Sequence, residues 1–313
     1  MTPDPAISRP ATAAPRRPAP AGDTVDRRFS TRNYYRRPIA AGTRRRLSDF
    51  MAARTAGPLG SQARFKLLAA TPDDRRALWG LGTRGTIKNA TGFVVGAVQT
   101  APHDLEDYGY LLEWIVLCAT GLGLGTCWLG GTFRRTALVW RFGRLLPGET
   151  MPAVVATGYG SEDGTTRLRL RKTGDRRLPA EELCFDGGFG EPLTASRAGR
   201  YAAALEAVRM GPSNRNAQPW RIVRSAGGAG GDGSAPPHDW HFYLQRPDGS
   251  GKGDIVTKVL RIADLERVAL GIAMCHFELV AREAGLGGGW VVEDPGLDVP
   301  EGTEYTATWR PAD

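Results

Sequence analysis

Two long apolar segments that end in the same way constrain the fold of this chain more than any other feature of its sequence. Apolar residues recur at helical spacing along residues 104–122 and 264–284, which predicts two long helices. With their tails, the segments DLEDYGYLLEWIVLCATGLGLGTCW (104–128) and DLERVALGIAMCHFELVAREAGLGGGW (264–290) can be aligned. The alignment pairs Gly109 with Gly271, Ala119 with Ala281, Gly123 with Gly285, Leu124 with Leu286, Gly125 with Gly287, and Trp128 with Trp290. We therefore expect two similar units packed together.

A second similarity lies upstream of each long helix. Residues 53–65 (ARTAGPLGSQARF) resemble residues 208–220 (VRMGPSNRNAQPW), including a shared Gly-Pro. The alternative is a chance likeness of two amphipathic helices, but the matched glycines and the common helix ends argue against it. We predict a disordered Pro- and Ala-rich tail at residues 1–25, a first half at 26–190 and a second half at 191–313, packed as an internal pseudo-dimer.

Shorter elements surround the two helices. Helical patterns are found at residues 40–56, 73–81 and 195–210. Strand patterns are found at residues 65–70, 92–98, 152–158, 220–223, 241–244 and 290–292, followed by an extended stretch at 305–309. An Arg-rich loop at 167–177 and a Gly-rich loop at 227–237 interrupt them. Because helices and strands alternate at uneven spacing, we predict an α+β fold with a mixed sheet flanked by helices.

Several classes of protein are disfavoured by the composition. No apolar run approaches the roughly 20 residues that span a bilayer, and the N-terminal residues lack the apolar core of a signal peptide, which favours a cytoplasmic protein without a membrane partner. The net charge of +8 suggests a nucleic-acid partner, but the arginines alternate with acidic residues and no nucleic-acid motif is present. The four cysteines (Cys118, Cys127, Cys184 and Cys275) show no metal-ligand spacing, so we expect reduced thiols and no metal.

One candidate binding segment is Arg28-Phe29-Ser30-Thr31-Arg32. Two guanidinium groups and a hydroxyl within five residues can grip a phosphate, because arginine offers a planar fork of donors. Alone, the segment is better interpreted as a solvated basic stretch, since other arginines lie nearby.

A stronger candidate is the segment 211–220 (GPSNRNAQPW), between a predicted helix and a predicted strand. A plain turn does not require so many amide and hydroxyl side chains, which can bind the edge of a heterocycle or a polyol chain. Pro219 is expected to hold Gln218 extended and directed out of the loop. The candidate binding residues here are Pro212, Ser213, Asn214, Asn216 and Gln218.

A third candidate is Trp128-Leu129-Gly130-Gly131, where paired glycines permit close approach to a flat ligand. A simple connection between two elements explains it equally well. The Arg-rich loop offers a further phosphate contact, although most of its arginines are expected to be solvated.

Together these segments resemble the nitroreductase family of FMN-dependent reductases. RFSTRNY is similar to the family's motif for the FMN phosphate and ribityl chain, and PSNRNAQPW to its Pro-Ser-x-x-Asn-x-Gln-Pro-Trp loop. GLGLGTCWLGG resembles the segment along the flavin ring, and GDRRLPAEEL resembles a late basic motif, matching best at Arg177. The resemblance covers residues 26–292 and implies a nitroreductase-like fold that binds FMN and uses NAD(P)H.

The order of the motifs departs from the ordinary family pattern. There the Pro-Ser-x-x-Asn loop follows soon after the first motif and reaches the flavin from the partner subunit, whereas here it lies in the second half and only GPLGSQARF holds the early position. We hypothesise that the second half replaces the partner, which gives one FMN site per chain. The branch labelled putative nitroreductases is similar in this respect.

The resemblance implies an oxidoreductase that passes hydride from NAD(P)H through FMN to a nitroaromatic, quinone or similar small acceptor. No protein residue is expected to be catalytic, since flavin carries the redox chemistry. The alternative is a flavin-binding protein with little or no turnover, a carrier or a sensor. The chain is expected to be a monomeric pseudo-dimer or a homodimer.

Overall fold

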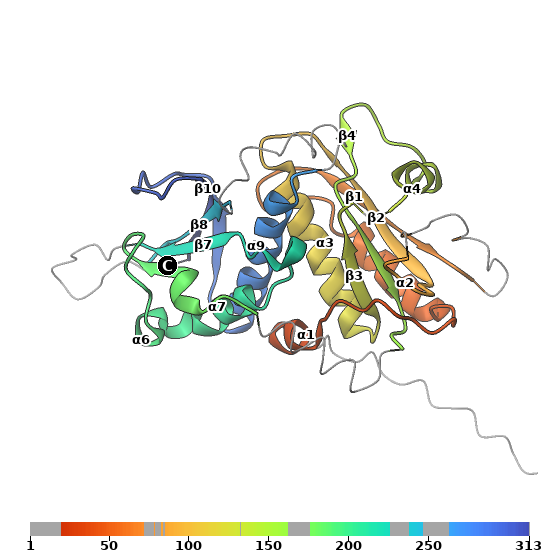
Figure 1. The fold of residues 1–313 in the computed structure, drawn as a ribbon, viewed down its shortest axis with the longest axis horizontal. Coiled ribbons are helices and arrows are strands. Elements are labelled where there is room, and N and C mark those ends of the chain that lie inside the picture. Colours follow the sequence, from red (N-terminus) through yellow and green to blue (C-terminus); the bar gives the residue numbers. More distant parts are fainter. Residues whose placement is uncertain are drawn as a thin grey trace, which may run out of the picture.

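Two five-stranded sheets flank a central pair of long helices, α3 and α9 (Figure 1). The computed structural model describes residues 20–71, 78, 83, 85–131, 133–161, 176–225, 238–246 and 263–312. Most of the predicted helix at 73–81, the Arg-rich loop up to residue 175 and the Gly-rich loop at 227–237 lie outside these residues. The predicted α+β architecture is confirmed. No helix within the described ranges is long and apolar enough to cross a membrane.

The first sheet has the strand order β1–β2–β5–β3, and every pairing in it is antiparallel. Its strands are β1 (Ala63–Ala69), β2 (Gly92–Gln99), β5 (Val154–Gly158) and β3 (Gly125–Leu129), and β4 (Glu149–Thr150) pairs with β2. The apolar side chains of β2 are buried on both faces, because α3 (Asp104–Gly121) packs on one face and α4 (Arg135–Phe142) on the other. α2 (Ala41–Ala52) precedes β1 and packs against it.

The second sheet has the order β6–β7–β8–β10–β9. Its strands are β6 (Cys184–Asp186), β7 (Trp220–Arg224), β8 (Trp240–Gln245), β10 (Thr303–Pro311) and β9 (Gly288–Val291). β6 and β7 are parallel and the other pairs are antiparallel, so this is the mixed sheet. α7 (Ala202–Arg209) and α9 (Leu265–Glu283) pack together, and aromatic side chains around Phe277 fill the space between α9 and the strands.

The two sheets share a connectivity. In the first, α3 follows β2 and leads into β3; in the second, α9 follows β8 and leads into β9. Both helices end at a glycine with positive φ, 81° at Gly123 and 74° at Gly285, a conformation that glycine adopts without strain. The next residue in each case donates a 2.9 Å backbone hydrogen bond to the aligned alanine, Ala119 or Ala281.

The two long helices touch at their aligned glycines. A Cβ atom on Gly109 would overlap the backbone of Val268, and one on Gly271 would overlap the backbone of Glu106. Only glycine permits so close an approach of two helix backbones. The contacts are reciprocal: Gly109 meets Val268, three residues before Gly271, and Gly271 meets Glu106, three residues before Gly109.

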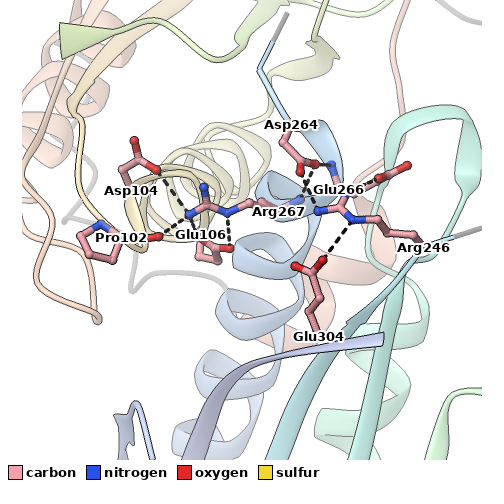
Figure 2. A network of polar contacts seen from close by, with 8 residues as sticks. All are labelled: Pro102, Asp104, Glu106, Arg246, Asp264, Glu266, Arg267 and Glu304. Carbon is pink, nitrogen blue, oxygen red and sulfur yellow. Dashed lines mark hydrogen bonds and ion pairs between the residues drawn. The ribbon is translucent and has the colours of Figure 1, made fainter. Parts of the chain in front are cut away.

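An ion-pair network fixes the beginnings of both long helices (Figure 2). Arg267 of α9 reaches across to α3 and binds Glu106 at 2.6 Å, with Asp104 and the Pro102 carbonyl as further acceptors. Arg246, at the end of β8, binds Asp264 at 2.8 Å and Glu266 at 2.7 Å. Asp264 also caps α9, since its side chain accepts hydrogen bonds from the backbone of Glu266 and Arg267.

Several elements differ from the sequence-based predictions. The tail was expected to extend to residue 25, but α1 (Ala21–Arg27) is a helix with Thr24 and Val25 buried. The predicted helix at 195–210 is interrupted: α6 (Ala195–Ala198) is followed by a 3-10 turn, η2 (Gly199–Tyr201), before α7. Gly199 has φ of 53°, which breaks the helix. β3, α4, β4, β6 and the 3-10 turns η1 (Ala180–Glu182) and η3 (Asn214–Asn216) were not predicted.

Candidate functional site

Two adjoining hollows lie between the halves of the chain. The first has a volume of about 1540 Å³ and the second about 260 Å³. Both are lined from the first half by residues of the segment 28–32 and from the second half by residues of the loop 212–216. The residues that line both hollows are Ser30, Arg32, Pro212, Ser213 and Arg215. The two segments singled out in the sequence thus meet, although they lie far apart in the chain.

β3 holds the segment 28–32 in place. Ser30 forms a parallel bridge with Thr126, and the backbone N–H of Thr31 donates to the Thr126 carbonyl at 2.8 Å. A Cβ on Gly125 would lie 2.6 Å from the Thr31 hydroxyl, so glycine is required for this close pairing. The segment therefore runs beside β3 and enters the first hollow next to the strand that leads to Trp128.

Several arginines line the first hollow, and three of them come from separate segments of the chain. Arg28, Arg177 and Arg209 all line it, and they come from the segment after α1, the segment before η1 and the end of α7. Nε and Nη1 of Arg177 are buried without a hydrogen-bond partner among the described residues. Burial, helped by the charges of Arg28 and Arg209, lowers the pKa of Arg177 to about 10. Such unsatisfied, mutually repelling donors form a site that an anion would stabilise.

Arg209 and Arg215 were missed as site residues in the sequence. Arg209 forms two hydrogen bonds to Glu206, of 2.7 and 2.6 Å, and both side chains line the first hollow. Arg215 lies inside the candidate loop 211–220, has a φ of 52° and lines both hollows. A basic residue within a loop rich in amides gave no signal of its own.

Gln218 was predicted to be extended and to point out of its loop, and this is wrong. Its φ is 50° and it is 2% exposed. Its side chain accepts a 2.9 Å hydrogen bond from the Leu178 N–H and donates to the carbonyls of Arg176 and Asn216. Gln218 lines neither hollow; instead it holds the chain on both sides of Arg177.

The other predicted loop residues lie at the site. Pro212 and Ser213 line both hollows, Asn214 lines the second and Asn216 the first. The Ser213 hydroxyl accepts a 2.9 Å hydrogen bond from the backbone N–H of Gln218, and the Asn216 amide donates to the Arg176 carbonyl at 3.0 Å. These bonds fix the loop against the segment that carries Arg177.

Two apolar groups of residues line the second hollow, beside the polar residues of the segment 28–32 and the loop 212–216. The predicted residues Trp128, Leu129, Gly130 and Gly131 form one wall at the end of β3. Leu265, Val268, Ala269 and Ile272 of α9 form another, and these were not predicted because residues at such spacing read as ordinary helix core. Gly130 lies so close to Leu265 that a Cβ on it would overlap that side chain.

Of the predicted residues in the segment 28–32, Arg28 and Phe29 line only the first hollow, whereas Ser30 and Arg32 line both. The Arg28 side chain is 7% exposed and lies 3.8 Å from the fully buried Glu113. Burial lowers the pKa of Arg28, although Glu113 acts in the opposite direction. Glu113 also accepts a 2.7 Å hydrogen bond from the Trp128 indole, so one carboxylate contacts a wall residue of each hollow.

Comparisons with known proteins give one matching family model and several similar structures. The family model described as "Putative TM nitroreductase" matches residues 22–281. A putative nitroreductase from Thermotoga maritima is 18% identical, with 96% of this chain and 98% of that chain covered and a TM-score of 0.57. A putative nitroreductase from Desulfovibrio desulfuricans, solved in complex with FMN, is 21% identical over 56% of this chain and 98% of that chain, with a TM-score of 0.42. A nitroreductase family protein from Clostridium difficile 630 is 20% identical over 51% and 94%, with a TM-score of 0.40. None of the curated proteins matches.

Proposed function

We propose that this chain, which belongs to the putative TM nitroreductase family, binds one FMN between its halves and acts as an FMN-dependent NAD(P)H oxidoreductase. The observation that carries the proposal is the pairing of an anion site with an apolar slot. The first hollow presents buried donors of Arg177 that no described residue satisfies, beside Arg28, and the second is small and lined by α9 and the end of β3. The phosphate of FMN matches the anion site of the first hollow and its flat ring matches the apolar second hollow. The polyol chain would connect the two.

Each predicted residue has a part in this arrangement. Arg28, Arg32 and Arg177 would bind the phosphate, and Ser30, Ser213, Asn214 and Asn216 the ribityl chain and the ring edge. Trp128, Leu129, Gly130, Gly131, Phe29 and Pro212 would line the ring and chain. Gln218 would act indirectly, because its hydrogen bonds fix the backbone around Arg177. Bound flavin supplies the hydride chemistry, while these residues orient it and exclude water.

We further propose that the two halves are a duplicated unit and that only one site remains. The common strand order and the reciprocal glycine contacts of α3 and α9 support duplication. In the alignment, the α9 wall residues Val268, Ala269 and Ile272 correspond to Glu106, Asp107 and Tyr110 of α3.

The residues on α3 would close the equivalent second site. The Asp107 carboxylate accepts hydrogen bonds from the backbone of Leu59 at 2.8 Å and Ser61 at 2.7 Å, in the segment that resembles the PSNRNAQPW loop. A carboxylate that is 0% exposed and bonded to this loop fills the space that Ala269 leaves open on the other side. The expected stoichiometry is one FMN per chain, with the second half in place of a partner subunit.

The substrates proposed are NAD(P)H as hydride donor and a small electron-poor acceptor such as a nitroaromatic or a quinone. A second candidate function, a flavin carrier or sensor with little turnover, is favoured by the size of the second hollow. Its 260 Å³ is below the roughly 300–1,000 Å³ of common ligand sites, so a ring bound there leaves little room for a second one.

The visible spectrum of the purified protein tests the proposal, with flavin identified and counted per chain. A colourless protein that takes up no added FMN would refute it, and two FMN per chain would refute the single site. Anaerobic mixing of the holoprotein with NADH or NADPH separates the two functions. Bleaching, followed by reoxidation with a quinone, is expected for the reductase. Flavin that stays oxidised supports the carrier. A cytoplasmic location and a monomer or homodimer remain predictions.

A further inference from the structure

A fully buried carboxylate connects the two hollows with the second half of the chain. Glu113 lies in the middle of α3 and is 0% exposed. Its Oε2 accepts the hydrogen bond from Nε1 of Trp128, and its Oε1 lies 3.8 Å from Nε of Arg28. The same Oε1 is 3.0 Å from Nε2 of His276 in α9. His276 is also 0% exposed, so the contact is shielded from water.

Both ring nitrogens of His276 face oxygen atoms. Nδ1 is 2.8 Å from the carbonyl oxygen of Ala207 in α7, and Nε2 is 3.0 Å from Glu113. A carbonyl oxygen only accepts hydrogen bonds, so Nδ1 carries a hydrogen. A hydrogen bond between Nε2 and a carboxyl oxygen then needs one more hydrogen, on the imidazole or on the carboxyl group. The Glu113–His276 pair therefore holds one proton beyond a carboxylate and a neutral imidazole, and its net charge is zero.

This proton decides the charge that Arg28 offers to the first hollow. The Arg28 side chain is 7% exposed, and its Nε has no hydrogen-bond partner within the described part of the chain. Beside a bare carboxylate in a dry interior, its positive charge would be largely cancelled. Because His276 balances Glu113, the three groups together keep one positive charge, which belongs to Arg28. The neighbouring Cys275 adds none, since burial raises the pKa of its thiol well above the usual value.

We propose that His276 is a positioning residue that keeps Glu113 electrically balanced, so that the full charge of Arg28 is available to the phosphate of the flavin. The inference rests on the proposed FMN site. It assigns a role to a residue that lines neither hollow, and it makes the second half of the chain responsible for the strength of the phosphate site in the first half.

Comparing FMN with riboflavin isolates this effect, because riboflavin has the same ring and chain without the phosphate. His276→Asn keeps a donor for the Ala207 carbonyl, and His276→Gln keeps a donor for Glu113, but neither can carry a charge. At about pH 8.5 we expect either variant to weaken FMN binding on the order of tenfold, the effect of one uncompensated charge at a distance of ~10 Å. Riboflavin affinity should change by less than about twofold, because riboflavin carries no charge for Arg28 to attract.

Adding Glu113→Gln to His276→Asn supplies the decisive control. The double variant no longer has the uncompensated carboxylate, so its FMN affinity should return to within about threefold of the wild type. If the role of His276 were purely structural, the double variant would lose more FMN affinity than His276→Asn alone. His241→Asn is the matched control, since His241 is a buried histidine on β8 that bonds Thr308 at 2.8 Å and lines neither hollow. Its FMN affinity should not change.

The outcomes separate this inference from the proposed function. Wild-type protein that binds neither flavin refutes the function. The role of His276 alone is overturned if the wild type binds FMN but the His276 variants weaken FMN and riboflavin binding equally, or weaken neither. It is also overturned if adding Glu113→Gln does not restore the FMN affinity. Nitrogen-15 NMR of the wild type needs no variant: a hydrogen on Nδ1 is expected, and an unprotonated Nδ1 would overturn the proton assignment.

Discussion

Replacing Arg177 by methionine should weaken flavin binding and at the same time stabilise the flavin-free protein. The guanidinium is partly buried beside Arg28 and Arg209, and no described residue bonds its Nε or Nη1. Within the described ranges it donates one hydrogen bond, from Nη2 to the Met210 carbonyl at 3.1 Å. Such a group costs stability unless an anion binds it. Removing it should therefore raise the stability of the flavin-free protein and lower its affinity for FMN.

The magnitudes follow from these contacts. A pKa lowered to about 10 corresponds to a penalty of about 3 kcal/mol on the charged form at neutral pH, before the partial exposure of the head is considered. Methionine removes the charge but also loses the bond to Met210, worth about 1 kcal/mol. We expect Arg177→Met to raise the free energy of unfolding of the flavin-free protein by about 1–2 kcal/mol. Loss of two charge-assisted bonds to the phosphate should weaken FMN binding by about 100-fold.

Urea unfolding with and without FMN, and fluorescence titration with FMN, measure both effects. Arg176→Met is the matched control, because that neighbouring side chain is exposed and lines neither hollow. The reasoning is refuted if Arg177→Met destabilises the flavin-free protein, or if it binds FMN as tightly as the control does.

Four further predictions concern other residues. Gly109→Ala should lower the free energy of unfolding by about 2–4 kcal/mol, because its Cβ overlaps the α9 backbone. Gly42→Ala in α2, with no atom within 4 Å of the new Cβ, should raise it by about 0.5 kcal/mol in the same urea assay. Gln218→Ala should raise the Kd for FMN about tenfold by releasing the backbone around Arg177; an unchanged Kd would contradict its positioning role. Ala269→Asp should abolish flavin binding without loss of the far-ultraviolet circular dichroism spectrum.

The long elements were predictable from the sequence because they carry periodic signals. The patterns at 104–122 and 264–284 correspond to α3 and α9, and the glycines at their ends mark where each helix ends. The interruption near Gly199 was not predictable, since an isolated glycine is tolerated in helices and only tertiary contacts decide whether the backbone turns there. α1 was missed because composition marked its surroundings as disordered, although Thr24 and Val25 are buried.

The lining of the two hollows was predictable where polar residues are dense and unpredictable where apolar residues contribute to it. Residues 28–32 and 212–216 meet at the hollows, as the sequence suggested. Val268 and Ala269 gave no signal, because a residue that lines a slot and one that packs in a core share the same helical spacing. Arg209 was not predicted because it lies at the end of an ordinary helical pattern. The side chain of Gln218 was misjudged because the local preference before proline yielded to the hydrogen bonds that Gln218 makes.

The duplication proposed above would explain why the two sides of the α3–α9 pair differ at aligned positions. In a homodimer, a substitution on the interface helix appears at both sites, so an aspartate that fills one site also fills the other. In a single chain the aligned positions vary independently: Asp107 binds the backbone of Leu59 and Ser61, whereas its aligned residue, Ala269, lines the second hollow. The same freedom applies to Glu113, whose aligned residue is Cys275. The buried Glu113–His276 pair lies on the side where Arg28 lines the first hollow, so the second half contributes His276 to a candidate site whose arginine belongs to the first.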